Sequence, residues 1–127
     1  MDLKERKILH LKFGLSLLMI LNERKEQARE NKKNGINDHK LISSLRKLAA
    51  ASAIDYGTIQ KISKGDQGFE FFTFIDIIDA LGLDMSQFSK YFYSISDDAV
   101  KQYYSSIINS RKAKPIVKKA IKKRKSK

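Results

Sequence analysis

Apolar side chains recur every three to four residues through most of this chain, which is the spacing of one face of an α-helix. In the first segment the pattern runs through Leu9, Phe13 and Leu17. One Pro and six Gly are too few for the many turns of a β-sandwich or barrel, so we predict an all-α fold. The predicted helices cover about residues 3–31, 45–52, 56–63, 71–81 and 97–110, with one more starting after residue 84.

Polar residues that cap helices stand directly before three of these segments. Ser44, Asp55 and Asp84 each precede an apolar helical pattern, and Gln87 completes a capping box with Asp84. The turn residues 34–38 end the first helix. A short helical stretch capped by Asn37 or Asp38 is expected to continue through Leu41 and Ile42. At the other end of the chain, Pro115 is expected to end the last helix.

Positive charge is concentrated at one end of the chain. The net charge is +12, and ten Lys or Arg with no acidic residue lie between Arg111 and Lys127. The preceding 110 residues hold sixteen basic and fourteen acidic residues, a net of only +2. Such a tail attracts polyanions, nucleic acid first and an anionic membrane surface second. The simpler alternative is a solvated, disordered end that only keeps the protein soluble. The absence of Cys excludes disulfides and thiol chemistry.

The N-terminal segment resembles an export signal only in part. An apolar run, 13–21, follows a basic segment, but the charged residues 22–26 come next in place of a cleavage site. The run is about half the length of a membrane span. We therefore predict neither export nor membrane insertion, and a cytoplasmic, nucleoid-associated protein.

Residues 44–65 combine two short helices with a three-residue turn. Leu48 and Ala49 form a small apolar inner face on the first helix, Ala53 begins the bend, and Ile59 anchors the second helix. In a helix-turn-helix the first helix braces the second, which lies in the major groove of DNA. The segment predicts such a motif centred on residues 45–63.

The same residues resemble a known family. The run SLRKLAAASAIDYGTIQKISKG (44–65) looks like the core of the phage-repressor-like, or xenobiotic-response-element, family of bacterial transcriptional regulators. The similarity continues through TFIDIIDALGLDMSQF (73–88), and residues 13–20 are similar to the family's first helix, so that it covers about residues 12–93. The resemblance implies a five-helix repressor-like DNA-binding domain, here with an extended first helix, an extra C-terminal helix and a basic tail.

Four features depart from the family pattern. Residues 24–43 separate the first two helices, where the family has a short connection. Leu45 replaces a common Gln that touches phosphate, and Ala53 replaces the usual Gly of the bend. Leu21 and Ser63 stand where the family often has a charged Arg–Glu pair; losing both avoids one unpaired buried charge.

The resemblance also implies which side chains contact DNA from the recognition helix, 55–63. Gln60 would pair with adenine and Lys61 with guanine or phosphate, while Tyr56 would donate a hydrogen bond or pack on a thymine methyl. An ordinary hydrated helix surface is the alternative for any one of them. The complete base-reading set is Tyr56, Gly57, Thr58, Gln60 and Lys61.

Phosphate contacts are expected from two further groups. The motif supplies polar and basic residues at its helix ends, where backbone amides also bind phosphate: Ser44, Arg46, Lys47 and Lys64. The tail supplies nucleic-acid contacts through Lys118, Lys119, Lys122, Lys123, Arg124 and Lys125.

Candidate enzyme chemistry is sparse. The two histidines, His10 and His39, lie in separate segments without acidic partners at metal-ligand spacing. Asp76 and Asp79 share the polar face of one helix, where solvated carboxylates are usual. We therefore predict no catalytic residues, no metal and no cofactor.

The predicted organisation has three parts: a helix-turn-helix DNA-binding domain at 1–95 with its motif at 44–64, an additional helix at 96–112, and a disordered basic tail at 113–127. The predicted function is sequence-specific binding of double-stranded DNA by a homodimeric repressor. Two alternatives stay open. One is an antitoxin-like or adaptor protein that binds a protein partner through the helix of Tyr103, Tyr104, Ile107 and Ile108. Exposed Phe69 or Phe72 would instead suggest a dimer face. The other is nonspecific nucleic-acid binding through the tail.

Overall fold

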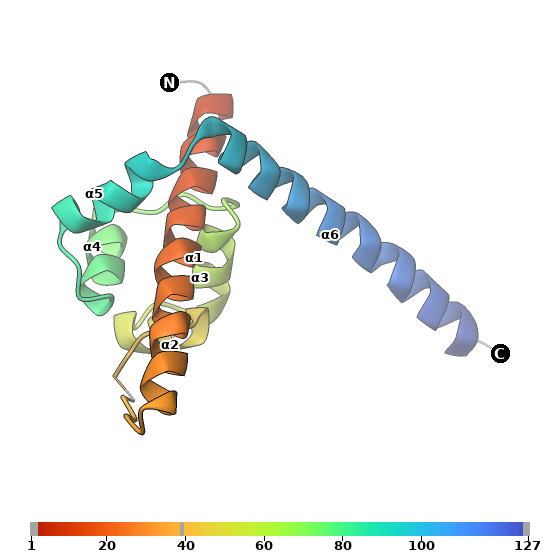
Figure 1. The fold of residues 1–127 in the computed structure, drawn as a ribbon. Coiled ribbons are helices and arrows are strands. Elements are labelled where there is room, and N and C mark those ends of the chain that lie inside the picture. Colours follow the sequence, from red (N-terminus) through yellow and green to blue (C-terminus); the bar gives the residue numbers. More distant parts are fainter. Residues whose placement is uncertain (1–2, 39, 126–127) are drawn as a thin grey trace.

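The computed structural model describes the backbone of residues 3–38 and 40–125 and the side chains of residues 4–38 and 40–112. Within these residues the chain forms six helices and no strands, which confirms the predicted all-α fold with a long first helix. Figure 1 shows α1 running through the molecule, with shorter helices packed around it and α6 extending away. The helices are α1 (Leu3–Lys33), α2 (Leu45–Ser52), α3 (Tyr56–Ser63), α4 (Phe71–Ala80), α5 (Met85–Ser94) and α6 (Asp97–Lys125).

The main core is built around the middle of α1. Leu17 and Ile20 are fully buried there, and each of the four following helices adds at least one buried side chain. Burial of large aliphatic side chains stabilises such a core by about 1.5–3 kcal/mol each. The buried residues contributed by α2 to α5 include Leu48, Ile59, Ile77 and Phe88.

A second, smaller core joins α6 to the N-terminal half of α1. Leu11 of α1 packs with Ile95, Val100 and Ile107, all of which are buried. Ala99 and Tyr103 pack against this cluster from the same helix, α6. The start of α6 is therefore attached to the body of the protein by its own apolar contacts.

Side-chain caps mark the starts of three helices, α2, α3 and α5. The Ser44 hydroxyl accepts a hydrogen bond from the Lys47 amide at 3.1 Å, and the Asp55 carboxylate accepts one from the Thr58 amide at 3.2 Å. Asp84 and Gln87 form the predicted capping box at the start of α5. Because these caps satisfy otherwise unpaired amides, they fix where α2, α3 and α5 begin.

Two predicted boundaries are wrong. Residues 40–44 are irregular rather than helical; the Asp38 carboxylate bonds to the Lys40 amide and the Asp38 carbonyl to the Leu41 amide, which makes an isolated turn. α6 continues through Pro115 to Lys125 instead of ending before the proline. A proline removes one backbone donor, and the Ala and Lys residues around it favour helix.

The α1–α3 contact depends on the lack of a side chain at Gly14. A Cβ atom built on Gly14 would lie 2.2 Å from the carbonyl oxygen of Ser63, the last residue of α3. Two helix backbones approach this closely only where one of them carries no side chain. Gly14 therefore sets how near α3 lies to the central helix.

Each helix is either too short or too polar to cross the apolar interior of a bilayer, within the part of the chain that the structure describes. The most apolar stretch of α1 instead supplies the main core, where Leu17, Ile20 and Leu21 are buried. This agrees with the sequence expectation that residues 13–21 do not form a membrane span.

Replacing Gly14 with Ala tests the α1–α3 contact. We expect Gly14→Ala to lower the free energy of unfolding by about 3 kcal/mol, because the new methyl group meets rigid backbone atoms. Gly57→Ala is the matched control, since a Cβ there would meet only the flexible Asp55 carboxylate, at 3.0 Å. The control gains helix propensity and should change stability by less than about 1 kcal/mol. Equal effects in urea unfolding would contradict the packing argument.

Candidate nucleic-acid interface

α2 and α3 pack against each other across the three-residue turn 53–55. Ala53 adopts a left-handed conformation with a φ of 58°, a geometry that glycine adopts more easily. Asp55, the last residue of the turn, has a φ of -53° and a ψ of 135° and caps α3 by accepting a hydrogen bond from the Thr58 amide. The sequence places the bend correctly, and the structure shows that Ala53 takes a glycine-like backbone there.

The two edges of α3 have opposite environments. Ile59 and Ile62 are fully buried, with 0% and 1% of their surface exposed. On the other edge Lys61 is exposed, and Thr58 and Gln60 are half-buried. The apolar edge anchors the helix, so the polar edge stays in contact with solvent.

All five residues predicted to read bases lie on α3, and each retains contact with solvent. Gly57 and Tyr56 are half-buried at the N-terminal end of the helix. Tyr56 packs against the main core, while the Arg46 guanidinium lies 4.4 Å from the centre of its ring. The tyrosine therefore packs on two sides, which restricts where it can reach.

The predicted phosphate contacts separate into two groups. Ser44, Arg46 and Lys47 lie together at the start of α2, where Ser44 caps the helix and the Lys47 ammonium donates to the Ser43 hydroxyl at 3.3 Å. Lys64 lies at the other end, as the exposed C-cap of α3. Cations thus lie at both ends of the two-helix unit, on either side of the polar edge of α3.

The described residues of the connection between α1 and α2 include a segment beside the start of α2. Ile36, Asn37 and Asp38 line one small pocket together with Lys47 and the last turns of α1. Arg24 of α1 donates to the carbonyl oxygen of Leu81, at the C-terminal end of α4. Ile36, Asn37 and Asp38 thus lie near Lys47 at the start of α2, and all five base-reading residues keep contact with solvent.

A group of long-range contacts that the sequence did not predict holds the C-terminal end of α3. The Lys7 ammonium donates to the Gly65 carbonyl at 2.6 Å and lies 3.4 Å from the Asp66 carboxylate. Arg111 of α6 forms an ion pair with the same carboxylate. Through these contacts Lys7 of α1 and Arg111 of α6 are linked to the loop that follows α3.

Tyr103 adds a direct contact between α6 and the end of α3. Its hydroxyl donates to the carbonyl oxygen of Ser63, one of the carbonyls that a helix end leaves without an intrahelical partner. The protein-partner alternative would use the surface of this helix. Tyr103 is half-buried against α3 and Ile107 is buried in the small core, while Tyr104 is 40% exposed.

Leu21 and Ser63, which stand where the family often has an Arg–Glu pair, are held by different contacts in this structure. The α1 residue that meets Ser63 is Gly14, seven positions or about 10 Å along the helix from Leu21. Leu21 is buried in the main core, and the Ser63 hydroxyl donates to the Gln60 carbonyl at 2.7 Å. A hydrogen bond within α3 thus satisfies the buried Ser63 side chain.

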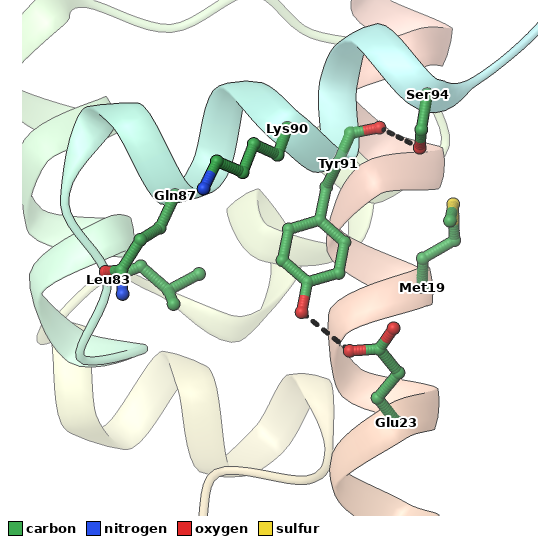
Figure 2. A pocket seen from close by; sticks show the side chains of 7 residues that line it. All are labelled: Met19, Glu23, Leu83, Gln87, Lys90, Tyr91 and Ser94. Atoms are coloured by element: carbon green, nitrogen blue, oxygen red, sulfur yellow. Dashed lines mark hydrogen bonds between the residues drawn. The ribbon is translucent and has the colours of Figure 1, made fainter.

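Figure 2 shows a pocket of about 480 Å³ between α1 and α5. The Tyr91 hydroxyl donates to the Glu23 carboxylate at 2.6 Å, and the Ser94 hydroxyl donates to the Tyr91 carbonyl. The hydrogen bond to Glu23 raises the pKa of Tyr91, with burial as the second cause. Gln87 is held in its capping box. These polar groups bond to one another or to backbone rather than meeting around a common point in the pocket.

The residues considered for enzyme chemistry are dispersed. His10 is half-buried beside Gly68, whereas Asp76 and Asp79 are exposed on α4. Among the described residues, no three His, Cys, Asp or Glu side chains are grouped as metal ligands would be. His39 lies outside the described residues.

The side chains predicted to bind nucleic acid from the tail lie outside the described ones, which end at residue 112. The backbone of this segment belongs to the last turns of α6. The residues concerned are Lys118, Lys119, Lys122, Lys123, Arg124 and Lys125.

Comparisons with protein-family models, with curated proteins and with solved structures find no match for this chain. The family suggested by residues 12–93 therefore stays a prediction.

The Tyr103 contact has a testable pH dependence. Burial raises the pKa of Tyr103 to about 12, and the negative charge of Asp66 adds to the effect. The unfolded phenol ionises near pH 10, so the stability due to Tyr103 is complete below about pH 10 and falls as the pH rises towards 12. We expect Tyr103→Phe to cost about 1 kcal/mol of unfolding free energy at about pH 8.

Urea unfolding of both proteins at about pH 8 and about pH 11 measures this dependence. The difference between wild type and Tyr103→Phe should shrink at the higher pH, because only the wild-type unfolded state gains a charged phenolate at this position. Both proteins share all other titrating groups. A difference that stays constant between the two pH values would contradict a buried, hydrogen-bonded phenol.

Proposed function

We propose that this protein is a sequence-specific, double-stranded DNA-binding transcriptional regulator that acts as a repressor. In this proposal α2 and α3 form a helix-turn-helix within a five-helix repressor-like domain, α1 to α5. The observation that carries the proposal is the position of α3, whose apolar edge is fully buried and whose polar edge faces solvent. Eight residues give α3 a length of about 12 Å, comparable with the width of the major groove.

Lys61 and Gln60 are the proposed centre of base recognition. Lys61 is exposed and has the donor that guanine requires, and the Gln60 amide matches the donor and acceptor of adenine. Tyr56 lies at the start of the helix, where Arg46 packs on its ring; that contact keeps a cation close to the proposed groove. Thr58 and Gly57 complete the proposed surface.

Phosphates on either side of the groove would be bound at the two ends of the unit. Ser44, Arg46 and Lys47 lie at the start of α2, with its free backbone amides, and Lys64 lies beyond α3. Such contacts orient a protein on DNA without reading sequence. The basic end of α6 would add affinity of the same kind.

A homodimer on DNA fits the small size of one such unit, since paired half-sites increase the buried surface and the specificity. The two most exposed phenylalanines support a protein contact: Phe71 is 60% and Phe72 is 75% exposed at the start of α4. Phe69 instead packs on the Phe13 ring, with centroids 4.3 Å apart. An antitoxin-like or adaptor partner would use the same exposed pair, so Phe71 and Phe72 also support that alternative.

Selection of bound sites from random duplex DNA tests the recognition surface. We expect Gln60→Ala and Lys61→Ala each to relax the preference at one or two base positions and to weaken the selected site by about 5- to 150-fold. Gln102→Ala and Lys90→Ala are matched controls, because both residues are exposed on other helices. Unchanged site preference in both α3 variants would dismiss the assigned roles of these side chains.

Removal of residues 113–127 tests the contribution of the tail. This truncation removes eight cations but keeps Arg111 and its ion pair with Asp66. We expect affinity to fall for all DNA sequences and the slope of log affinity against log salt to flatten by at most about 7, while the preferred site persists. Loss of all sequence preference, with full binding by the isolated tail peptide, would favour the nonspecific alternative.

A further inference from the structure

Six aromatic rings line a single groove between α1, α4 and α5, which we call the aromatic groove. Its volume is about 350 Å³, within the range of small-molecule sites. The Phe13 ring lies at the base, with its centroid between 4.3 and 5.6 Å from those of three other rings. The lining rings are Phe13, Phe69, Phe74, Phe88, Phe92 and Tyr93.

The side chains at the base of the groove are buried, and those at its rim are exposed. Phe13 and Phe88 are only 4% and 3% exposed, whereas Met85 and Tyr93 at the rim are 51% and 76% exposed. Leu9 adds a further partly exposed apolar wall, 37% exposed. A ligand in the groove would cover apolar surface that now meets water, and flat rings would stack or pack edge-on against the phenylalanines.

The charges around the groove favour an anion. Its lining includes His10 and no acidic residue. The Lys12 ammonium lies beside it, 4.9 Å from the centre of the Phe92 ring and 5.6 Å from that of Tyr93. No ion pair between Lys12 and a carboxylate is present among the described residues. A cation over two rings, without an acid to neutralise it, is available to a ligand.

We propose that the aromatic groove binds a small planar aromatic carboxylate, with its rings against Phe13, Phe88 and Phe92 and its carboxylate towards Lys12. The volume fits one such molecule, and the charge complementarity selects the anion over a neutral or cationic analogue. In the view of Figure 1, α4 and α5 lie on the opposite side of α1 from α3, so this site is separate from the proposed DNA surface. Its existence does not depend on DNA binding.

Calorimetric titration of the full chain with 1-naphthoate tests the proposal, and 1-naphthamide serves as the neutral analogue. We expect 1-naphthoate to bind at least fivefold more tightly than the amide. Lys12→Gln should remove this preference, whereas the matched control Lys90→Gln, on the exposed surface of α5, should keep it. Met85→Trp places a large ring at the exposed rim and should weaken 1-naphthoate at least tenfold, with circular dichroism confirming that the variant is folded.

Three results would overturn the proposal. Absence of 1-naphthoate binding at millimolar concentration would do so, and so would equal affinity for the acid and the amide in the wild type. The third is a dimer, seen by sedimentation, that Met85→Trp dissociates while 1-naphthoate does not bind; the groove would then be covered by a second copy of the chain. None of these measurements involves DNA, so their outcome is independent of the proposed regulator function.

Discussion

The position of α3 depends on the close approach of two backbones at Gly14 and Ser63. With no side chain at Gly14, the last turn of α3 lies directly against the central helix. This contact allows Ile59 and Ile62 to reach the main core, because the helix is near enough for their side chains to be completely enclosed. The polar edge of α3 faces solvent as a consequence of this packing.

Polar contacts from α1 and α6 also converge on the C-terminal end of α3 and the loop after it. A helix terminus leaves carbonyl groups without partners inside the helix. Tyr103 of α6 donates to the Ser63 carbonyl, one of these helix-end groups, and Lys7 of α1 donates to the Gly65 carbonyl in the loop that follows. The ion pairs of Asp66 are partly exposed and contribute at most about 1 kcal/mol each. Their role is to orient the loop and α6 rather than to stabilise the fold.

The two proposed sites differ in chemistry. α2 and α3 offer short, capped helices with polar edges and cations at their ends. The α4–α5 side offers aromatic rings, of which Phe13 and Phe88 are buried and Tyr93 is open to water. Because α1 contributes Phe13 to the groove and Gly14 to the contact with α3, neighbouring residues of one helix join the two proposed sites.

Local features of the sequence determine that the segments are helical and where most of the helices start. Caps at Ser44, Asp55 and Asp84 act over three residues, and helical periodicity acts over one or two turns, so both can be recognised without the fold. The residues expected on the outer edge of α3 could likewise be named, because burial of Ile59 and Ile62 determines the opposite edge.

Only the tertiary structure decides how α3 is held. Gly14, Lys7, Tyr103 and Arg111 contact the end of α3 across sequence separations of 40 residues or more, and no local spacing marks them. The failed expectation at Leu41–Ile42 has a related origin, since the weak local preferences there did not determine the backbone. Short-range hydrogen bonds can be recognised from neighbouring residues. The contacts that orient one helix against another arise only when distant segments pack.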